Sequence, residues 1–216
     1  MAESFPLPVF KFFLDLPIRE VTFRLDAVQS VSQTAGGDVI PHQIGARLWR
    51  GEIVLDKEYH RAAAYYEARL ALLQEPQASF MLFDPRVRAP AYDPDGALVA
   101  GADVRIATLS ANARDLTLKN LPPGYELTRG DLMGWSYGSD PVRHALHRVV
   151  RGGTAGGDGT TPEIEVVPAV RDGVAADAPV TLIEPALKAR VVSAEYGRGR
   201  SRIAPGGRLS WIQTLR

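Results

Sequence analysis

The sequence contains no cysteine and little lysine. Without cysteine the chain has no disulfide framework, no thiol nucleophile and no cysteine-ligated zinc site, and its composition fits any redox compartment. Acidic and basic residues balance at 25 each, so the net charge is zero, which argues against a nucleic-acid binder that works through a large basic field. Apolar stretches such as 6–18 are interrupted by Lys11, Asp15 and prolines. We therefore expect no membrane-spanning segment, and no secretion signal is recognisable.

What is present is typical of a folded domain. The 216 residues are 45% apolar and 23% charged, which fits one ordinary domain or two small ones. Glycine (20) and proline (16) divide the chain into short runs, and in runs such as 20–28 and 48–55 large apolar side chains alternate with polar ones. Further strands are expected at 79–83, 103–109, 115–118, 132–137, 145–151, 163–170, 180–183, 187–195 and 208–215. The pattern predicts a mainly β protein, a split barrel or sandwich.

One segment, 57–75, has the composition and spacing of an amphipathic helix. Asp56 stands where a capping residue would stand, Glu58 would lie in the first turn, and Pro76 follows the predicted end. The predicted apolar stripe consists of Tyr59, Ala62, Ala63, Tyr66, Leu70 and Leu73. The residues expected to pack the barrel against this helix are Trp49, Ile53, Leu55, Tyr66, Leu70, Phe80 and Leu82.

Two other segments have a distinct composition. Residues 84–101 hold three prolines, which favours a domain boundary or a crossover over a core strand. Residues 151–162 hold five glycines, which predicts a mobile hairpin tip. Gly37-Asp38 is one of three Gly-Asp pairs that indicate turns.

The candidates for catalysis are weak. Residues 134–138 match the G-x-S-x-G string of a nucleophile elbow around Ser136, with Asp140, His144 and His147 downstream. An elbow needs a helix after the serine, and β-patterned residues follow here, so we interpret Ser136 as an ordinary residue near a strand end. His144 and His147 would lie on opposite faces of a strand, so they would not share a metal ion. The sequence therefore assigns no catalytic, cofactor-binding or metal-binding residue, and we expect the protein not to be an enzyme.

Arginine outnumbers lysine by 21 to four, and Arg198, Arg200 and Arg202 alternate in one short segment. These arginines would serve phosphate contact or ion pairs across a subunit boundary, or they would belong to a solvated turn. The glycine-rich residues 152–159 lack the Lys-Ser/Thr of a phosphate-binding loop.

A family resemblance begins in residues 49–85. The order there is an amphipathic strand (WRGEIVL), a helix (KEYHRAAAYYEARLALLQE), a hydrophobic strand (SFMLF) and Asp84-Pro85. This order resembles the ring-forming domain of phage distal tail proteins, and it is similar to the small minor tail proteins of lambda-like phages. Residues 187–195 and 208–215 resemble the final hairpin of that domain.

The middle of the chain resembles a module in tail-tip proteins of phages that infect α-proteobacteria. The residues that carry this resemblance are 121–135 (LPPGYELTRGDLMGW), 144–150 (HALHRVV) and 164–182 (IEVVPAVRDGVAADAPVTL).

The resemblance implies a tail-tube-like β-barrel domain, residues 1–85 and 186–216 with helix 57–75, and an inserted β domain, residues 86–185. It also implies a structural virion protein of the tail tip of a long-tailed phage or gene-transfer particle, assembled in the cytoplasm of the host bacterium. The implied partners are further copies in a homohexameric ring, the tail tube protein and the hub or fibre protein, with the tape measure protein as a further candidate. Neither a cofactor, specific nucleic-acid binding nor membrane insertion is implied.

A second hypothesis is a β-sandwich module that binds carbohydrate or protein. It depends on Trp135 and Tyr137, because aromatic rings stack on the faces of sugars, and on the exposed turns expected in the inserted domain.

Overall fold

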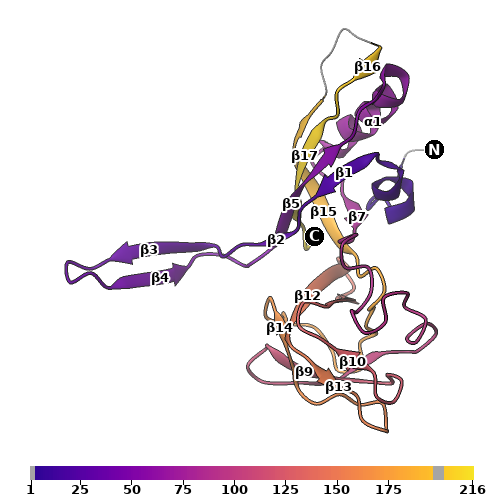
Figure 1. The fold of residues 1–216 in the computed structure, drawn as a ribbon. Helices are drawn as coiled ribbons and strands as arrows, with labels where there is room; N and C mark the ends of the chain where they lie inside the picture. The colour runs from indigo at the N-terminus through magenta and orange to yellow at the C-terminus, as the bar shows by residue number, and fades with distance from the viewer. Residues whose placement is uncertain (1–2, 197–201) are drawn as a thin grey trace.

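The computed structural model describes residues 3–196 and 202–216. In this part the protein is mainly β: two curled half-barrel sheets, several two-stranded sheets, one α-helix and one short bent helix. Figure 1 shows the two large sheets at opposite ends of the molecule, with a long hairpin that extends away from the first of them. The predicted fold class, a mainly β split barrel with one packed helix, is confirmed.

The first sheet has six strands and contains both early and late parts of the chain. Its order is β1-β5-β17-β15-β7, and β2 also pairs with β5. The bounds are β1 Ile18–Val21, β2 Arg24–Leu25, β5 Trp49–Leu55, β7 Phe80–Leu82, β15 Leu187–Glu195 and β17 Arg208–Gln213. The last strand of the chain therefore lies in the middle of this sheet.

Strand β5 shows why the sheet has one buried face. Its burial alternates along the strand, with Trp49, Ile53 and Leu55 inside as the sequence predicts. Residue 51 of the same strand must be glycine, because a Cβ there would lie 1.7 Å from the carbonyl oxygen of Thr22. The chain between β1 and β2 can approach β5 this closely only because residue 51 is glycine.

The helix is shorter than predicted. Helix α1 spans His60–Leu73, because Glu58 and Tyr59 form the short strand β6 (Glu58–Tyr59), which pairs with β16 (Ile203–Ala204). The predicted cap at Asp56 is wrong: Tyr59 occupies the N-cap position without a side-chain cap, and Asp56 accepts from the backbone N–H of Lys57 at 2.7 Å.

The apolar stripe of the helix is confirmed at its C-terminal end. Leu70 and Leu73 are buried, and Ala62, Ala63 and Tyr66 are half-buried. Tyr59, predicted as part of the stripe, is 68% exposed because it precedes the helix.

Short helical turns near the N-terminus cover the β7 end of the first sheet. These turns are η1 (Val9–Lys11) and η2 (Phe13–Asp15). Between them Phe12 packs edge-on against Phe80 of β7, with ring centroids 5.0 Å apart. Phe13 packs in the same way against Phe83 at 5.5 Å. This edge of the sheet is therefore closed by aromatic packing.

The second sheet has five strands in the order β11-β12-β14-β9-β8. The bounds are β8 Arg105–Leu109, β9 Asp115–Lys119, β11 Leu132–Tyr137, β12 Arg143–Arg151 and β14 Ile164–Val167. These strands lie within two residues of the predicted ones, except that β14 ends three residues early. The strand predicted at 180–183 is wrong, because the structure has only isolated bridges there, one of them pairing Gly134 with Thr181.

Residues 84–101 contain no helix or strand, as their prolines predict. Buried aspartates hold this crossover in place. Asp84 makes a two-pronged contact with the Arg86 guanidinium at 2.8 and 2.9 Å. Asp93 accepts from two backbone N–H groups within the crossover, and Asp131 accepts from the backbone N–H of Ala91 at 2.9 Å. Asp93 and Asp131 thus pair backbone N–H groups that no strand satisfies, and Asp84 fixes a side chain of the crossover.

The chain leaves the first sheet after β7 and returns at β15, and these two strands are paired, Leu82 opposite Leu187. Two separate clusters of buried apolar residues follow from this path. The first surrounds Trp49 and Trp211, and the second surrounds Trp135 and lies within 99–182. The division into domains at residues 85 and 186 stays a prediction.

The glycine-rich segment 151–162 is not the mobile tip that its composition predicts. Strand β13 (Gly153–Thr154) pairs with β10 (Glu126–Leu127), and Ala155 and Thr161 are buried. A Cβ on Gly152 would lie 1.8 Å from the Leu127 carbonyl oxygen. Glycine here allows close backbone contact, which composition alone does not distinguish from flexibility.

Candidate functional site

Ser136 and His144 face each other as a cross-strand pair on β11 and β12. The serine Oγ and histidine Nδ1 are 3.2 Å apart, and Ser136 is exposed. Burial and the charge of Lys188 lower the pKa of His144. No carboxylate within 3–196 and 202–216 hydrogen-bonds to this histidine, and β11 continues to Tyr137 without an elbow. The structure thus confirms the interpretation of Ser136 as a residue near a strand end.

His147 lies on the other face of β12, as its spacing from His144 predicts, and is 2% exposed. Its ring stacks on Trp135 with centroids 4.3 Å apart, and its Nδ1–H donates to the carbonyl of Pro168 at 2.8 Å. Burial lowers the pKa of His147 to about 4. The described residues contain no cluster of three or more side chains suited to a metal ion.

The aromatic pair that motivated the carbohydrate hypothesis is buried. Trp135 is 3% exposed and Tyr137 is 6% exposed, and both belong to the second apolar cluster. Neither ring face is available to stack on a sugar, so this aromatic pair does not support that hypothesis.

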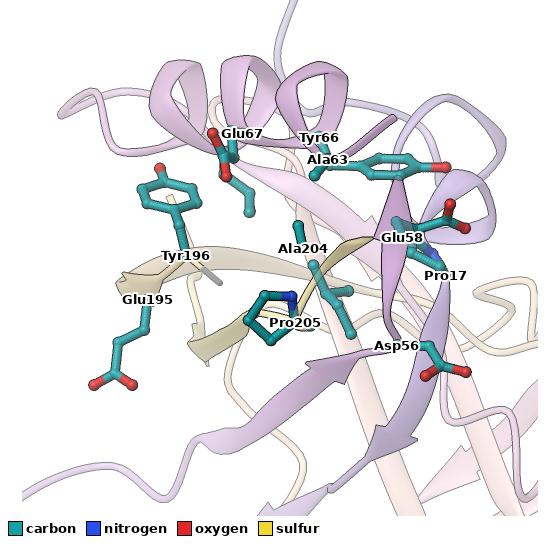
Figure 2. Close-up of a pocket in the computed structure, with 14 residues that line it drawn as sticks. Pro17, Asp56, Glu58, Ala63, Tyr66, Glu67, Glu195, Tyr196, Ala204 and Pro205 are labelled. Atoms are coloured by element: carbon teal, nitrogen blue, oxygen red, sulfur yellow. The ribbon is translucent and has the colours of Figure 1, made fainter. Parts of the chain in front are cut away.

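A crevice lies between α1 and the chain leading into β17. Figure 2 shows Ala63, Tyr66 and Glu67 on the helix, facing Ala204 and Pro205. Its volume is about 30 Å³, which is the space of a single water molecule. We interpret it as the packing seam between helix and sheet, too small for an organic ligand.

A further exposed feature is the hairpin of β3 (Gln29–Gln33) and β4 (Val39–Gln43). Every residue of both strands is exposed, and Figure 1 shows the hairpin extending away from the first sheet. The turn at Gly37-Asp38 is confirmed, with Gly37 at a φ of 87° and its N–H donating to Thr34.

One face of this hairpin is apolar at its centre. Val31 is paired with Pro41, and Val39 lies two residues from Pro41 on the same face. Val31 is 52% exposed and Val39 is 56% exposed. Between Ala27 and Ala46 the only formal charge is that of Asp38. In a chain with 23% charged residues, such a stretch is unusually neutral.

The two large sheets are joined by side chains that reach across. Trp49 donates through Nε1 to the carbonyl of Leu146 in β12 at 2.7 Å. Gln213, at the end of β17, donates through Nε2 to the carbonyl of His144 at 3.1 Å. The Arg148 guanidinium lies 5.0 Å from the centre of the Trp49 ring. These contacts attach β12 directly to the first sheet.

Of the alternating arginines, Arg198 and Arg200 lie outside the described residues, and Arg202 is exposed. No helix among the described residues is long and apolar enough to cross a membrane.

No family model matches the chain, and no curated protein matches it with significant similarity.

Proposed function

We propose that the protein is a structural subunit that assembles with copies of itself into a ring at the tip of a phage-type tail. In this proposal the ring, a hexamer by resemblance, joins the tail tube to the hub or fibre and works without catalysis. The virion tail tip is its location, and the cytoplasm of the host bacterium is where it is assembled.

The single observation that carries the proposal is the β3–β4 hairpin. An isolated two-stranded hairpin is marginally stable in water, because it buries little apolar surface. Its outer strand edges present unpaired N–H and C=O groups, which invite pairing with another chain. The hairpin keeps apolar Val31 and Val39 exposed and carries almost no charge. These properties suit a surface that becomes buried in an assembly.

The topology supports the same proposal. The last strand, β17, lies between β5 and β15, so the ends of the chain are tied into one sheet. Helix α1 and strand edges would supply further contacts between neighbours. Such contacts are head to tail, and they give a closed ring when the rotation between subunits closes.

The test is the solution mass of the purified chain by light scattering. We expect a closed hexamer, about six times the 23.5 kDa of one chain. A matched variant replaces residues 29–43 by Asn-Gly, which joins Val28 and Ile44 through a two-residue turn, since the N–H of Ile44 already donates to the carbonyl of Val28.

We expect this variant to be folded and monomeric. A wild-type chain that remains a monomer at all accessible concentrations would contradict self-assembly. A variant that still forms the wild-type oligomer would contradict the role of the hairpin in it.

A further inference from the structure

The β3–β4 hairpin leaves the first sheet at the end opposite to the N-terminal turns. It follows β2, which pairs with Trp49 and Arg50 at the start of β5, whereas η2 leads into β1, which pairs with residues 53–55 at the end of the same strand. In Figure 1 the hairpin extends to the left, and the N-terminal helical turns lie on the right. A ring built from one kind of contact needs a donor surface and an acceptor surface on different sides of the subunit.

The side with the N-terminal turns contains a cleft of about 550 Å³. Its lining includes Leu14, Leu16, Ile18, Arg19 and Pro85. The cleft follows β1, which is the terminal strand of the first sheet, so the outer edge of β1 has no strand partner among the described residues.

One apolar residue of the cleft lining is strongly exposed, and a second exposed apolar residue lies four positions earlier in the chain. Leu14 in η2 is 57% exposed, and Phe10 in η1, one turn earlier in the chain, is 68% exposed. Large apolar side chains at this exposure mark interaction surfaces when they gather beside a cleft. The face of the hairpin with Val31 and Val39 at its centre is also apolar and exposed.

The cleft lining also holds three charged side chains, Arg19, Glu20 and Arg86, of which Arg86 pairs with Asp84. Asp38 is the only formal charge of the hairpin segment and lies at its tip. Arg19 lies in the cleft lining, is exposed, and has no salt bridge within the described part of the chain. Within the described residues Asp38 and Arg19 thus each lack an ion-pair partner in their own chain, and their signs are opposite.

We propose that the β3–β4 hairpin of one copy docks into the cleft between η2 and β1 of the next copy. This proposal rests on the proposed function, because it names the acceptor surface of the same assembly. The hairpin strand lies along the open edge of β1, Val31 and Val39 pack on Leu14 and Phe10, and Asp38 approaches Arg19. Five residues of β-strand reach about 17 Å, enough to extend beyond one subunit into its neighbour.

The absence of cysteine makes this proposal directly testable by disulfide cross-linking. One preparation carries Val39→Cys and a second carries Leu14→Cys. The two are mixed, allowed to exchange subunits, oxidised, and separated on a non-reducing gel. Because each chain has a single cysteine, a cross-linked dimer can form only between two copies.

The control mixes Val39→Cys with Val142→Cys, an exposed position in the second half of the chain that is 45% exposed. We expect a dimer from the mixture of Val39→Cys with Leu14→Cys, and none beyond background from the control mixture or from Val39→Cys alone. Cross-links only between two Val39→Cys chains, or only between Val39→Cys and Val142→Cys, would overturn the proposed acceptor while the oligomer itself remained. A chain that stays monomeric in light scattering would overturn both proposals.

A charge exchange gives a second readout. Asp38→Arg and Arg19→Asp should each weaken assembly about fivefold at low salt, as measured from the concentration dependence of the mass. The double variant should restore assembly toward the wild type. Single variants that assemble as well as the wild type, or a double variant weaker than both, would contradict the docking geometry.

Discussion

Two hairpins of the chain differ in the burial of their side chains. The hairpin of β15 and β17 lies within the first sheet, and its side chains Leu187, Leu209 and Trp211 are at most 1% exposed. The β3–β4 hairpin has every strand residue exposed. Both obey the same antiparallel pairing rules, so backbone hydrogen bonding does not explain the difference.

Side-chain patterning explains it. Strand β17 alternates large buried residues with partly exposed ones, which gives the strand one strongly apolar face. The β3–β4 hairpin offers only two valines, an isoleucine and a proline among glutamines and serines. This is little apolar surface to pack against its own sheet, and in the proposed assembly it packs against a second chain.

The largest effect is expected in the buried hairpin. Leu209→Asp places an unpaired carboxylate at a position with 0% exposure, and we expect a loss of more than about 4 kcal/mol and an unfolded chain. Far-UV circular dichroism and a thermal melt measure this. The neighbouring Arg208→Gln, on the exposed face, should melt like the wild type. A folded Leu209→Asp protein would contradict the conclusion that the β15–β17 hairpin is buried and the β3–β4 hairpin is not.

Much of the buried framework could be predicted from the sequence. Strands β5, β11 and β15 were predictable because apolar residues recur at period two over several residues. Helix α1 was predicted but with the wrong start, because the pairing of β6 with β16 is a contact between residues far apart in the chain. Capping at Asp56 is a local pattern that this long-range pairing overrides.

The next largest effect concerns another buried hairpin, that of β11 and β12. Since the pKa of His147 falls from 6.5 to about 4 on folding, the unfolded chain binds a proton between these values and the folded chain does not. Stability is therefore full above pH 6.5, decreases as the pH falls toward 4, and levels off below. We expect a loss of about 2 kcal/mol between pH 7 and pH 5 from this group.

Urea unfolding of the wild type and of His147→Gln, measured at both pH values, isolates the contribution of His147, because His144 remains in both proteins. The variant should lose most of the pH dependence. His42→Gln in the exposed strand β4 should keep the wild-type dependence, since His42 is exposed. Equal pH dependence in His147→Gln and wild type would show that the histidine is not buried as described.

A smaller effect separates two buried tryptophans, Trp211 in the β15–β17 hairpin and Trp49 in the adjacent strand β5. Trp49 donates to the carbonyl of Leu146, whereas the Nε1 of buried Trp211 has no hydrogen-bond partner among the described residues. Both Trp→Phe changes remove similar volume, but only Trp49→Phe leaves a buried carbonyl unpaired. We expect Trp49→Phe to cost about 1 kcal/mol more than Trp211→Phe in urea unfolding. Equal costs would show that the contact between the two sheets adds nothing to stability.

The candidate assembly surface was not predictable in the same way. Nothing in 29–43 shows the alternation of a half-buried strand, and Pro41 argues against a central strand. The available signal was a Gly-Gly-Asp turn between two short neutral segments. The cleft at η2 and β1 joins residues 13–21 to Pro85 and Arg86, a proximity that no local pattern encodes.

The smallest effect on folding is expected in β4, at Val39 beside the tip of the exposed hairpin. Val39→Asp changes a side chain that is 56% exposed, so the free energy of unfolding should stay within about 0.5 kcal/mol of the wild type. The measurement belongs at a protein concentration low enough to keep the chain monomeric, because assembly would otherwise add to the apparent stability. At higher concentration the same variant should lose the oligomer. A loss of several kcal/mol in the monomer would mean that the hairpin packs against its own chain, and its exposure could then no longer be attributed to a missing neighbour.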